Sequence, residues 1–166
     1  MASAAARAWI GTIVFLFVAP GIVAGLIPWL ISGWQLHDWG DAAWLGVPIT
    51  WTVIAAGVLF LLTAFALFAM HRGTPAPVVP TETLVVTGVY RYVRNPMYLS
   101  VLAIIVGQAL LFGSWGLVIY AGIVLVMVVA FVKVYEEPTL TSRYGEQYVD
   151  YRRNVPGWWP RFPPWR

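Results

Sequence analysis

The sequence has 166 residues, of which 60% are hydrophobic and only 10% are charged. A soluble domain carries about 25% charged residues, which form the polar surface that it needs in water. The composition therefore excludes an ordinary soluble enzyme and a disordered protein, and it predicts a single integral membrane domain, 1–166. Cysteine is absent, which excludes disulfides and a thiol nucleophile, and no metal site is expected.

The net charge of +3 comes from basic residues that flank apolar segments. This arrangement indicates contact with membrane lipids through their anionic headgroups, and it gives no reason to expect a nucleic acid as partner.

The first apolar stretch, at about 9–31, is long enough for one membrane-spanning helix at about 20 residues per crossing. Pro20 and Pro28 should kink that helix, which neighbouring helices in a membrane tolerate. A cleaved signal peptide is the rival interpretation, because Arg7 precedes the stretch and small residues follow. The stretch is, however, longer than the ~7–15 residues of a signal-peptide core.

The second predicted span is 47–70. The uncharged run from 97 to 132 is too long for one crossing and slightly short for two. Because a Phe-Gly-Ser-Trp-Gly sequence at 112–116 supplies a turn, the run predicts a helical hairpin with spans at 97–111 and 115–134. The expected fold is therefore an all-α integral membrane protein with four transmembrane helices and a C-terminal helical hairpin.

The distribution of arginine predicts the orientation of these spans. The loop at 32–46 carries Asp38 and Asp41 but no arginine or lysine, whereas the loop at 71–96 and the tail at 135–166 carry eight of the nine arginines. Basic segments stay in the cytoplasm. Both termini, the 71–96 loop and the 135–166 tail are therefore expected to be cytoplasmic.

These two cytoplasmic segments have some predicted structure of their own. The 71–96 loop has three early prolines and then an extended stretch at 83–89. The tail contains a predicted amphipathic helix at 139–153, in which Tyr144, Tyr148 and Tyr151 recur on one face.

Any chemistry should lie where the hairpin meets the cytoplasm, because the spans contain no Asp, Glu or Arg, and their one Lys, Lys133, lies at the end of the last span. The motif at 88–98 leads into one leg of the hairpin, and Glu136-Glu137-Pro138 leaves the other. A proline disfavours helical geometry at the residue before it. We therefore expect the helix to break at Glu137, so that the two carboxylates serve different partners.

Each motif also has a purely structural interpretation. Arg91 and Arg94 suit the anchoring of a positive membrane face, and the two glutamates suit a solvated helix end that pairs with a nearby basic residue. Pro96 suits the first turn of a helix, and the tyrosines suit a membrane interface. The joint placement of the motifs favours a functional site.

Together the motifs resemble the isoprenylcysteine carboxyl methyltransferase and phospholipid methyltransferase superfamily. The resemblance covers about 84–161 and rests on Gly88-x-Tyr90-Arg91-x-x-Arg94-Asn95-Pro96-x-Tyr98, the hairpin, Glu136-Glu137-Pro138-x-Leu140-x-x-x-Tyr144-Gly145-x-x-Tyr148-x-x-Tyr151 and Val155-Pro156. This family usually has histidine where the chain has Asn95. Asparagine forms hydrogen bonds, but it does not titrate near neutral pH.

The resemblance implies an enzyme that moves a methyl group from S-adenosyl-L-methionine to a lipophilic acceptor, such as a prenylcysteine-like carboxylate or a phospholipid amine. It also implies that the C-terminal tail covers the cofactor at the cytoplasmic ends of the hairpin. Carboxylates suit the cationic groups of this cofactor, and arginine suits its carboxylate. The implied cofactor-binding residues are Tyr90, Arg91, Arg94, Asn95, Pro96, Tyr98, Glu136 and Glu137.

The catalytic role stays open among Asn95, Glu137 and Arg94. Two other functions also stay open. One is an NADPH-dependent membrane reductase of the sterol-reductase type, whose C-terminal hairpin is similar. The other is a non-catalytic membrane protein, chiefly because of Asn95.

Overall fold

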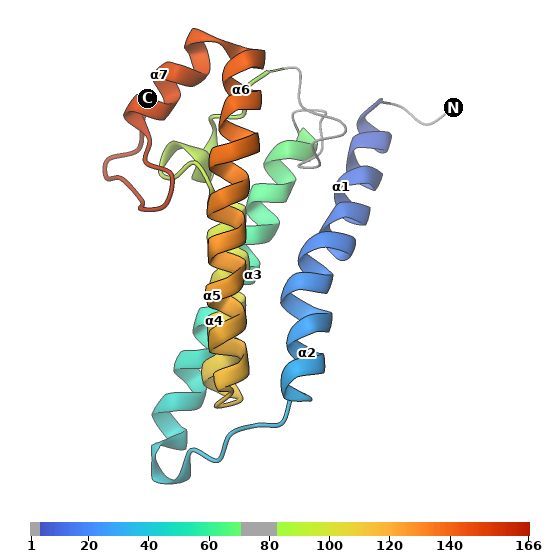
Figure 1. The fold of residues 1–166 in the computed structure, drawn as a ribbon, viewed down its shortest axis with the longest axis vertical. Helices are drawn as coiled ribbons and strands as arrows, with labels where there is room; N and C mark the ends of the chain where they lie inside the picture. Colours follow the sequence, from blue (N-terminus) through green and yellow to red (C-terminus); the bar gives the residue numbers. More distant parts are fainter. Residues whose placement is uncertain (1–3, 71–82) are drawn as a thin grey trace.

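The computed structural model describes residues 4–70 and 83–166. Within these ranges the regular structure is helical and includes no strand, as the sequence predicts. The three early prolines of the 71–96 loop, Pro75, Pro77 and Pro80, lie outside the described residues. The elements of the bundle, shown in Figure 1, are α1 (Ala4–Gly21), η1 (Ile22–Leu26), α2 (Ile27–Ser32), η2 (Gly40–Ala42), α3 (Ala43–Met70), α4 (Pro96–Leu111) and α5 (Trp115–Phe131).

Three continuous helical segments are long and apolar enough to cross a membrane, namely Trp9–Ser32, Gly40–Met70 and Trp115–Tyr144. The fourth predicted span corresponds to α4, which is apolar but shorter. Helix α4 packs closely along α3. A Cβ added to Gly57 of α3 would lie 2.8 Å from Ile104 of α4, and a Cβ added to Gly107 of α4 would lie 2.6 Å from Ile54 of α3. Small residues allow such a close approach between helices in a membrane.

The first span bends through a π-helical turn, η1, which ends two residues before Pro28. Proline has no N–H to donate to the helix, so carbonyl groups in the preceding turn lose a partner. One of them, the carbonyl of Val23, accepts a 2.9 Å hydrogen bond from the hydroxyl of Tyr120 on α5. The predicted distortion of this span therefore occurs, and another helix satisfies the carbonyl that it frees.

The predicted break at Glu137 is wrong. Helix α5 continues through a second π-helical turn, η4 (Val132–Glu136), into α6 (Glu137–Tyr144), and Glu137 has helical dihedral angles (φ −61°, ψ −44°). The π-helical turn absorbs the proline by widening the helix just before it. Glu136 and Glu137 nevertheless face different partners, because consecutive helical residues point about 100° apart.

The predicted single helix at 139–153 is also wrong. Two helices, α6 and α7 (Glu146–Asn154), meet at Gly145, whose φ of +55° is a conformation that glycine adopts without strain. The tyrosine face survives this turn. Tyr148 and Tyr151 are buried with Val155, and Tyr144 packs against them.

Beyond α7 the chain returns to the segment that precedes α4, which includes η3 (Gly88–Arg91). Backbone hydrogen bonds join the two segments from Arg94 N to the carbonyl of Pro156, from Arg161 N to that of Tyr92, and from Trp165 N to that of Arg91, at 2.9–3.0 Å. The C-terminal tail is thus fixed over the residues that begin the hairpin.

Candidate functional site

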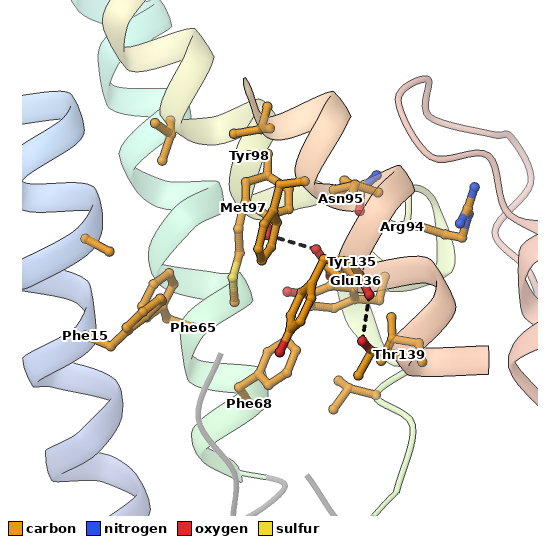
Figure 2. Close-up of a pocket in the computed structure, with 18 of the residues that line it drawn as sticks. Phe15, Phe65, Phe68, Arg94, Asn95, Met97, Tyr98, Tyr135, Glu136 and Thr139 are labelled. Carbon is orange, nitrogen blue, oxygen red and sulfur yellow. Dashed lines mark hydrogen bonds between the residues drawn. The ribbon is translucent and has the colours of Figure 1, made fainter. Parts of the chain in front are cut away.

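A cavity of about 410 Å³ lies between the helices and the tail, within the ~300–1,000 Å³ range of small-molecule sites. Its apolar arm runs between α1, α3, α4 and α5, where Phe15 and Phe65 stack with ring centres 6.1 Å apart. Its polar end lies among the 84–98 segment, the α5–α6 helix and α7. Figure 2 shows Phe15 and Phe65 at one side of this cavity and Glu136 and Asn95 at the other.

At the polar end the two legs of the hairpin are joined by a hydrogen bond. The hydroxyl of Tyr98 on α4 donates to Oε2 of Glu136 at 2.9 Å, as marked in Figure 2. A carboxylate accepts several hydrogen bonds. Glu136 can therefore keep Tyr98 as a partner and still receive a cationic ligand in the cavity.

Asn95 lines the same end and is only 6% exposed. It immediately precedes α4 but does not cap it. Its side-chain nitrogen Nδ2 is buried and has no hydrogen-bond partner among the described residues. A buried donor without a partner costs about 1–3 kcal/mol. This nitrogen lies against the tail, because a Cβ added to Gly157 would be 3.3 Å from it. Asn95 thus combines a place in the cavity wall with an amide donor that no described residue uses.

Arg94 is held by the protein itself. Its Nη1 donates to Oε1 of Glu137 at 2.8 Å and to the hydroxyl of Tyr148 at 3.1 Å, while Nε donates to the carbonyl of Val155 at 2.9 Å. Burial lowers the pKa of Arg94, but the hydrogen bond to Glu137 and the neighbouring charges outweigh that effect and raise the pKa overall. Arg94 is therefore a permanent cation that ties α6 and α7 to the start of α4.

Glu137 and Arg91 lie beside the cavity rather than on it. Glu137 bonds to Arg94 and also approaches Arg152 at 3.3 Å. The Nε of Arg91 donates to the carbonyl of Trp165 in the tail. Pro96 is buried in the first turn of α4, which is the position that its structural interpretation predicts. Of the eight predicted residues, those that line the cavity are Tyr90, Arg94, Asn95, Tyr98 and Glu136.

Several cavity residues were not predicted from the sequence. Arg143, Thr139 and Tyr135 line the polar end, and Phe15 and Phe65 line the apolar arm. The cavity is also lined by three tyrosines of the tail, Tyr144, Tyr148 and Tyr151. Their spacing predicted that they share one face of a helix, but it did not predict that this face borders a cavity.

Burial raises the pKa of Tyr90 well above its usual value, and nearby Tyr151 and Glu136 raise it further. Burial likewise raises the pKa of Tyr148 and Tyr151, although the charge of Arg94 opposes the shift in both. These tyrosines therefore stay protonated at neutral pH and act as hydrogen-bonding groups. One such bond runs from the hydroxyl of Tyr151 to the carbonyl of Tyr90 at 2.7 Å.

Residues 51–147 match the phospholipid methyltransferase family. The chain belongs to this family. The matched segment contains α3 from Trp51 onward, the complete hairpin, the motif at 88–98 and Glu136-Glu137-Pro138. Many of the residues that line the cavity, including Asn95 and Glu136, therefore lie within it. Membership indicates a membrane methyltransferase and agrees with the superfamily resemblance of the sequence. Among the curated proteins that were compared, none matches this chain.

Proposed function

We propose that this family member transfers a methyl group from S-adenosyl-L-methionine to a lipophilic acceptor that comes from the bilayer. The supporting observation is that one cavity joins a carboxylate and an unpartnered buried amide, from Glu136 and Asn95, to an apolar arm between membrane-capable helices. A polar cofactor and an apolar acceptor can therefore meet there without either entering an unsuitable environment.

The chemistry of the cavity residues fits this cofactor. When bound, S-adenosyl-L-methionine supplies a methyl group activated by an adjacent sulfonium. Glu136 suits its cationic groups, and the side-chain amide of Asn95 suits a polar group of the cofactor. Arg143 lines the cavity, and we assign the cofactor's carboxylate to its guanidinium, which suits a carboxylate. Arg94 also lines the cavity and bonds to Glu137, Tyr148 and Val155.

Methyl transfer needs the reacting groups to be aligned and kept from water. The tail contributes by covering the polar end, where Tyr148 and Tyr151 line the cavity. A carboxylate or thiolate acceptor needs no base, whereas an ammonium acceptor must first lose a proton. Since Tyr148 and Tyr151 stay protonated, we assign the acceptance of this proton to Glu136.

We also propose that α4 crosses the membrane as a fourth span and that both termini lie in the cytoplasm. The arginine-rich segments before α4 and after α5 support this orientation. The cofactor would then reach the polar end from the cytoplasm, and the acceptor would reach the apolar arm from the surrounding lipid.

The experiment that tests the function compares ligands for the purified protein in detergent. We expect S-adenosylhomocysteine to raise the unfolding temperature and NADPH to have no effect. Incubation with methyl-labelled S-adenosyl-L-methionine and native membranes should then label an extractable lipophilic product, which identifies the acceptor. Stabilisation by NADPH alone would favour the reductase. A lack of both stabilisation and labelled product would favour a non-catalytic protein.

The cavity assignment is tested by Arg143→Gln, with Arg153→Gln as the matched control because Arg153 is an exposed arginine of α7 that does not line the cavity. We expect Arg143→Gln to weaken binding of S-adenosylhomocysteine by roughly tenfold or more, since a charge-assisted hydrogen bond is worth about 1.5–3 kcal/mol. Equal binding by the two variants would exclude Arg143 from the site.

A further inference from the structure

Two large aromatic side chains of the tail point into the surroundings. Trp159 is 78% exposed and Phe162 is 80% exposed, although Tyr148, Tyr151 and Val155 just before them are buried. The segment that contains the pair, 151–166, has four arginines and no acidic residue. The tail thus combines exposed aromatic rings with a uniform positive charge.

The backbone around this pair is fixed to the protein. Arg161 N donates to the carbonyl of Tyr92 at 2.9 Å, and Nη1 of Arg161 donates to the carbonyl of Asn154 at 2.6 Å. The ring of Phe162 also lies edge-on to that of Tyr92, with centres 5.7 Å apart. The two exposed rings are therefore held in place before they meet any partner, which lowers the entropic cost of binding.

The segment with Trp159 and Phe162 lies where the surface of the membrane is expected. Tyr92 comes four residues before the apolar helix α4, so the tail is fixed where the chain passes from a polar to an apolar segment. In Figure 1 the segment after α7 turns back toward the bundle and lies beside the upper part of the α5–α6 helix. Tryptophan, other aromatics and arginine are the residues that favour this interface.

We infer that the last part of the tail, 155–166, docks on the membrane. Trp159 and Phe162 would insert among the headgroups, and Arg161 and Arg166 would contact anionic phospholipid. Burial of apolar rings and attraction of basic residues to an anionic leaflet act together in such interfacial anchors. The partner is the lipid surface next to the polar end of the cavity, and the inference does not depend on the reaction that the cavity performs.

The absence of native cysteine allows a single nitroxide label to report this docking. Pro160→Cys places the label between the two rings without removing either, and Gln147→Cys places a matched label on exposed α7. In nanodiscs that contain phosphatidylglycerol, we expect the label at 160 to collide mainly with oxygen, which concentrates in lipid. The label at 147 should collide mainly with a water-soluble nickel chelate.

Adding Trp159→Ser and Phe162→Ser to Pro160→Cys should return the label at 160 to the nickel-accessible state. Replacing phosphatidylglycerol by phosphatidylcholine should reduce the preference for oxygen. Circular dichroism of each variant checks that the helices are intact. Equal nickel accessibility at 160 and 147 in the anionic nanodiscs would overturn the inference. Shielding of the label from both reagents, with spin–spin broadening, would also overturn it and assign the tail to a contact between two copies of the chain.

Discussion

The side-chain amide of Gln108 on α4 donates a 2.7 Å hydrogen bond to the backbone carbonyl of Ala24 in the π-helical turn of the first span. Pro28, four residues after Ala24, has no N–H for that carbonyl. The bond fixes the bend of the first span beside Pro20 and Val23, which line the apolar arm. A polar residue on one helix thus holds a cavity wall that belongs to another.

We predict that Gln108→Leu lowers the stability of the bundle by about 0.6–1.7 kcal/mol, the range measured for hydrogen bonds between membrane helices. Leucine keeps most of the volume, so the loss should come from the bond. Thr63→Val is the control, because Thr63 bonds only to Leu59 within its own helix among the contacts described. Reversible unfolding in detergent measures both variants, and equal losses would show that the interhelical bond has no special role.

We predict that Glu136→Gln and Glu137→Gln have different effects. Because Glu136 lines the cavity, its substitution should weaken S-adenosylhomocysteine binding by roughly ten- to a hundredfold and change stability little. Because Glu137 pairs with Arg94, its substitution should mainly lower the unfolding temperature. Calorimetric titration and thermal unfolding separate these effects. A larger binding loss in Glu137→Gln would instead place Glu137 in direct contact with the ligand.

We predict that Asn95→Ala changes stability and binding in opposite directions. Removing an unpartnered buried donor should raise the unfolding temperature of the ligand-free protein, whereas binding should weaken by about 0.5–1.5 kcal/mol. Asn95→His should add a titration near pH ~6.5 to the methyl-transfer rate. If the native rate already showed a group near that pH, and Asn95→Ala removed it, our view that Asn95 moves no proton would be wrong.

Stability should decrease in alkaline solution because of the buried tyrosines. The folded state raises the pKa of Tyr148 and Tyr151, so above pH ~10 the unfolded chain loses protons that the folded chain retains. The stability that these two tyrosines contribute is complete below pH ~10, and it is lost as the pH rises through their pKa values in the folded protein. Unfolding temperatures at stepwise higher pH should fall less steeply in Tyr148→Phe. An unchanged slope would mean that Tyr148 does not couple to folding.

Labelling from outside the cell tests the proposed orientation. The exposed Ala42, substituted by cysteine, should react with an impermeant reagent in intact cells. Cysteine at Gln147, also exposed, should react only after the membrane is opened. The opposite pattern would invert the topology and place the polar end of the cavity outside the cytoplasm.

The sequence predicts the helices well because long uncharged runs leave few alternatives. Helix α4 (Pro96–Leu111) begins one residue before its predicted start, and α5 begins at the predicted Trp115. The turn between them follows from Gly113, which has a φ of +58°. The two errors, at Pro138 and Gly145, concern residues that bend or interrupt helices. At Pro138 the helix is distorted and not broken because a π-helical turn, Val132–Glu136, precedes the proline. The proline itself does not predict whether such a turn will form.

The site was predicted less completely, for a physical reason. Arg91 bonds to the carbonyl of Trp165, and one of the bonds of Arg94 goes to the carbonyl of Val155. Such partners leave no trace in the sequence, because every residue has a backbone carbonyl. The apolar arm could not be predicted either, because Phe15 and Phe65 occur in spans that are hydrophobic on every side. By contrast, Glu136 stood out because carboxylates are rare next to such spans, and Tyr98 stood out because it belongs to the motif at 88–98.

Helix α4 has 16 residues and is therefore about 24 Å long, against a hydrocarbon thickness of about 30 Å. If its far end lies at the opposite headgroups, as the hairpin requires, the end that carries Asn95 and Tyr98 sits several ångströms below the near surface. The reaction site is then recessed into the lipid layer. A lipophilic acceptor would then be methylated while it stays within the lipid layer and need not enter water. The cofactor would enter the recess from the cytoplasmic side. If α4 is the fourth span that we propose, a thicker bilayer would deepen this recess, and we expect the rate of methyl transfer to depend on membrane thickness.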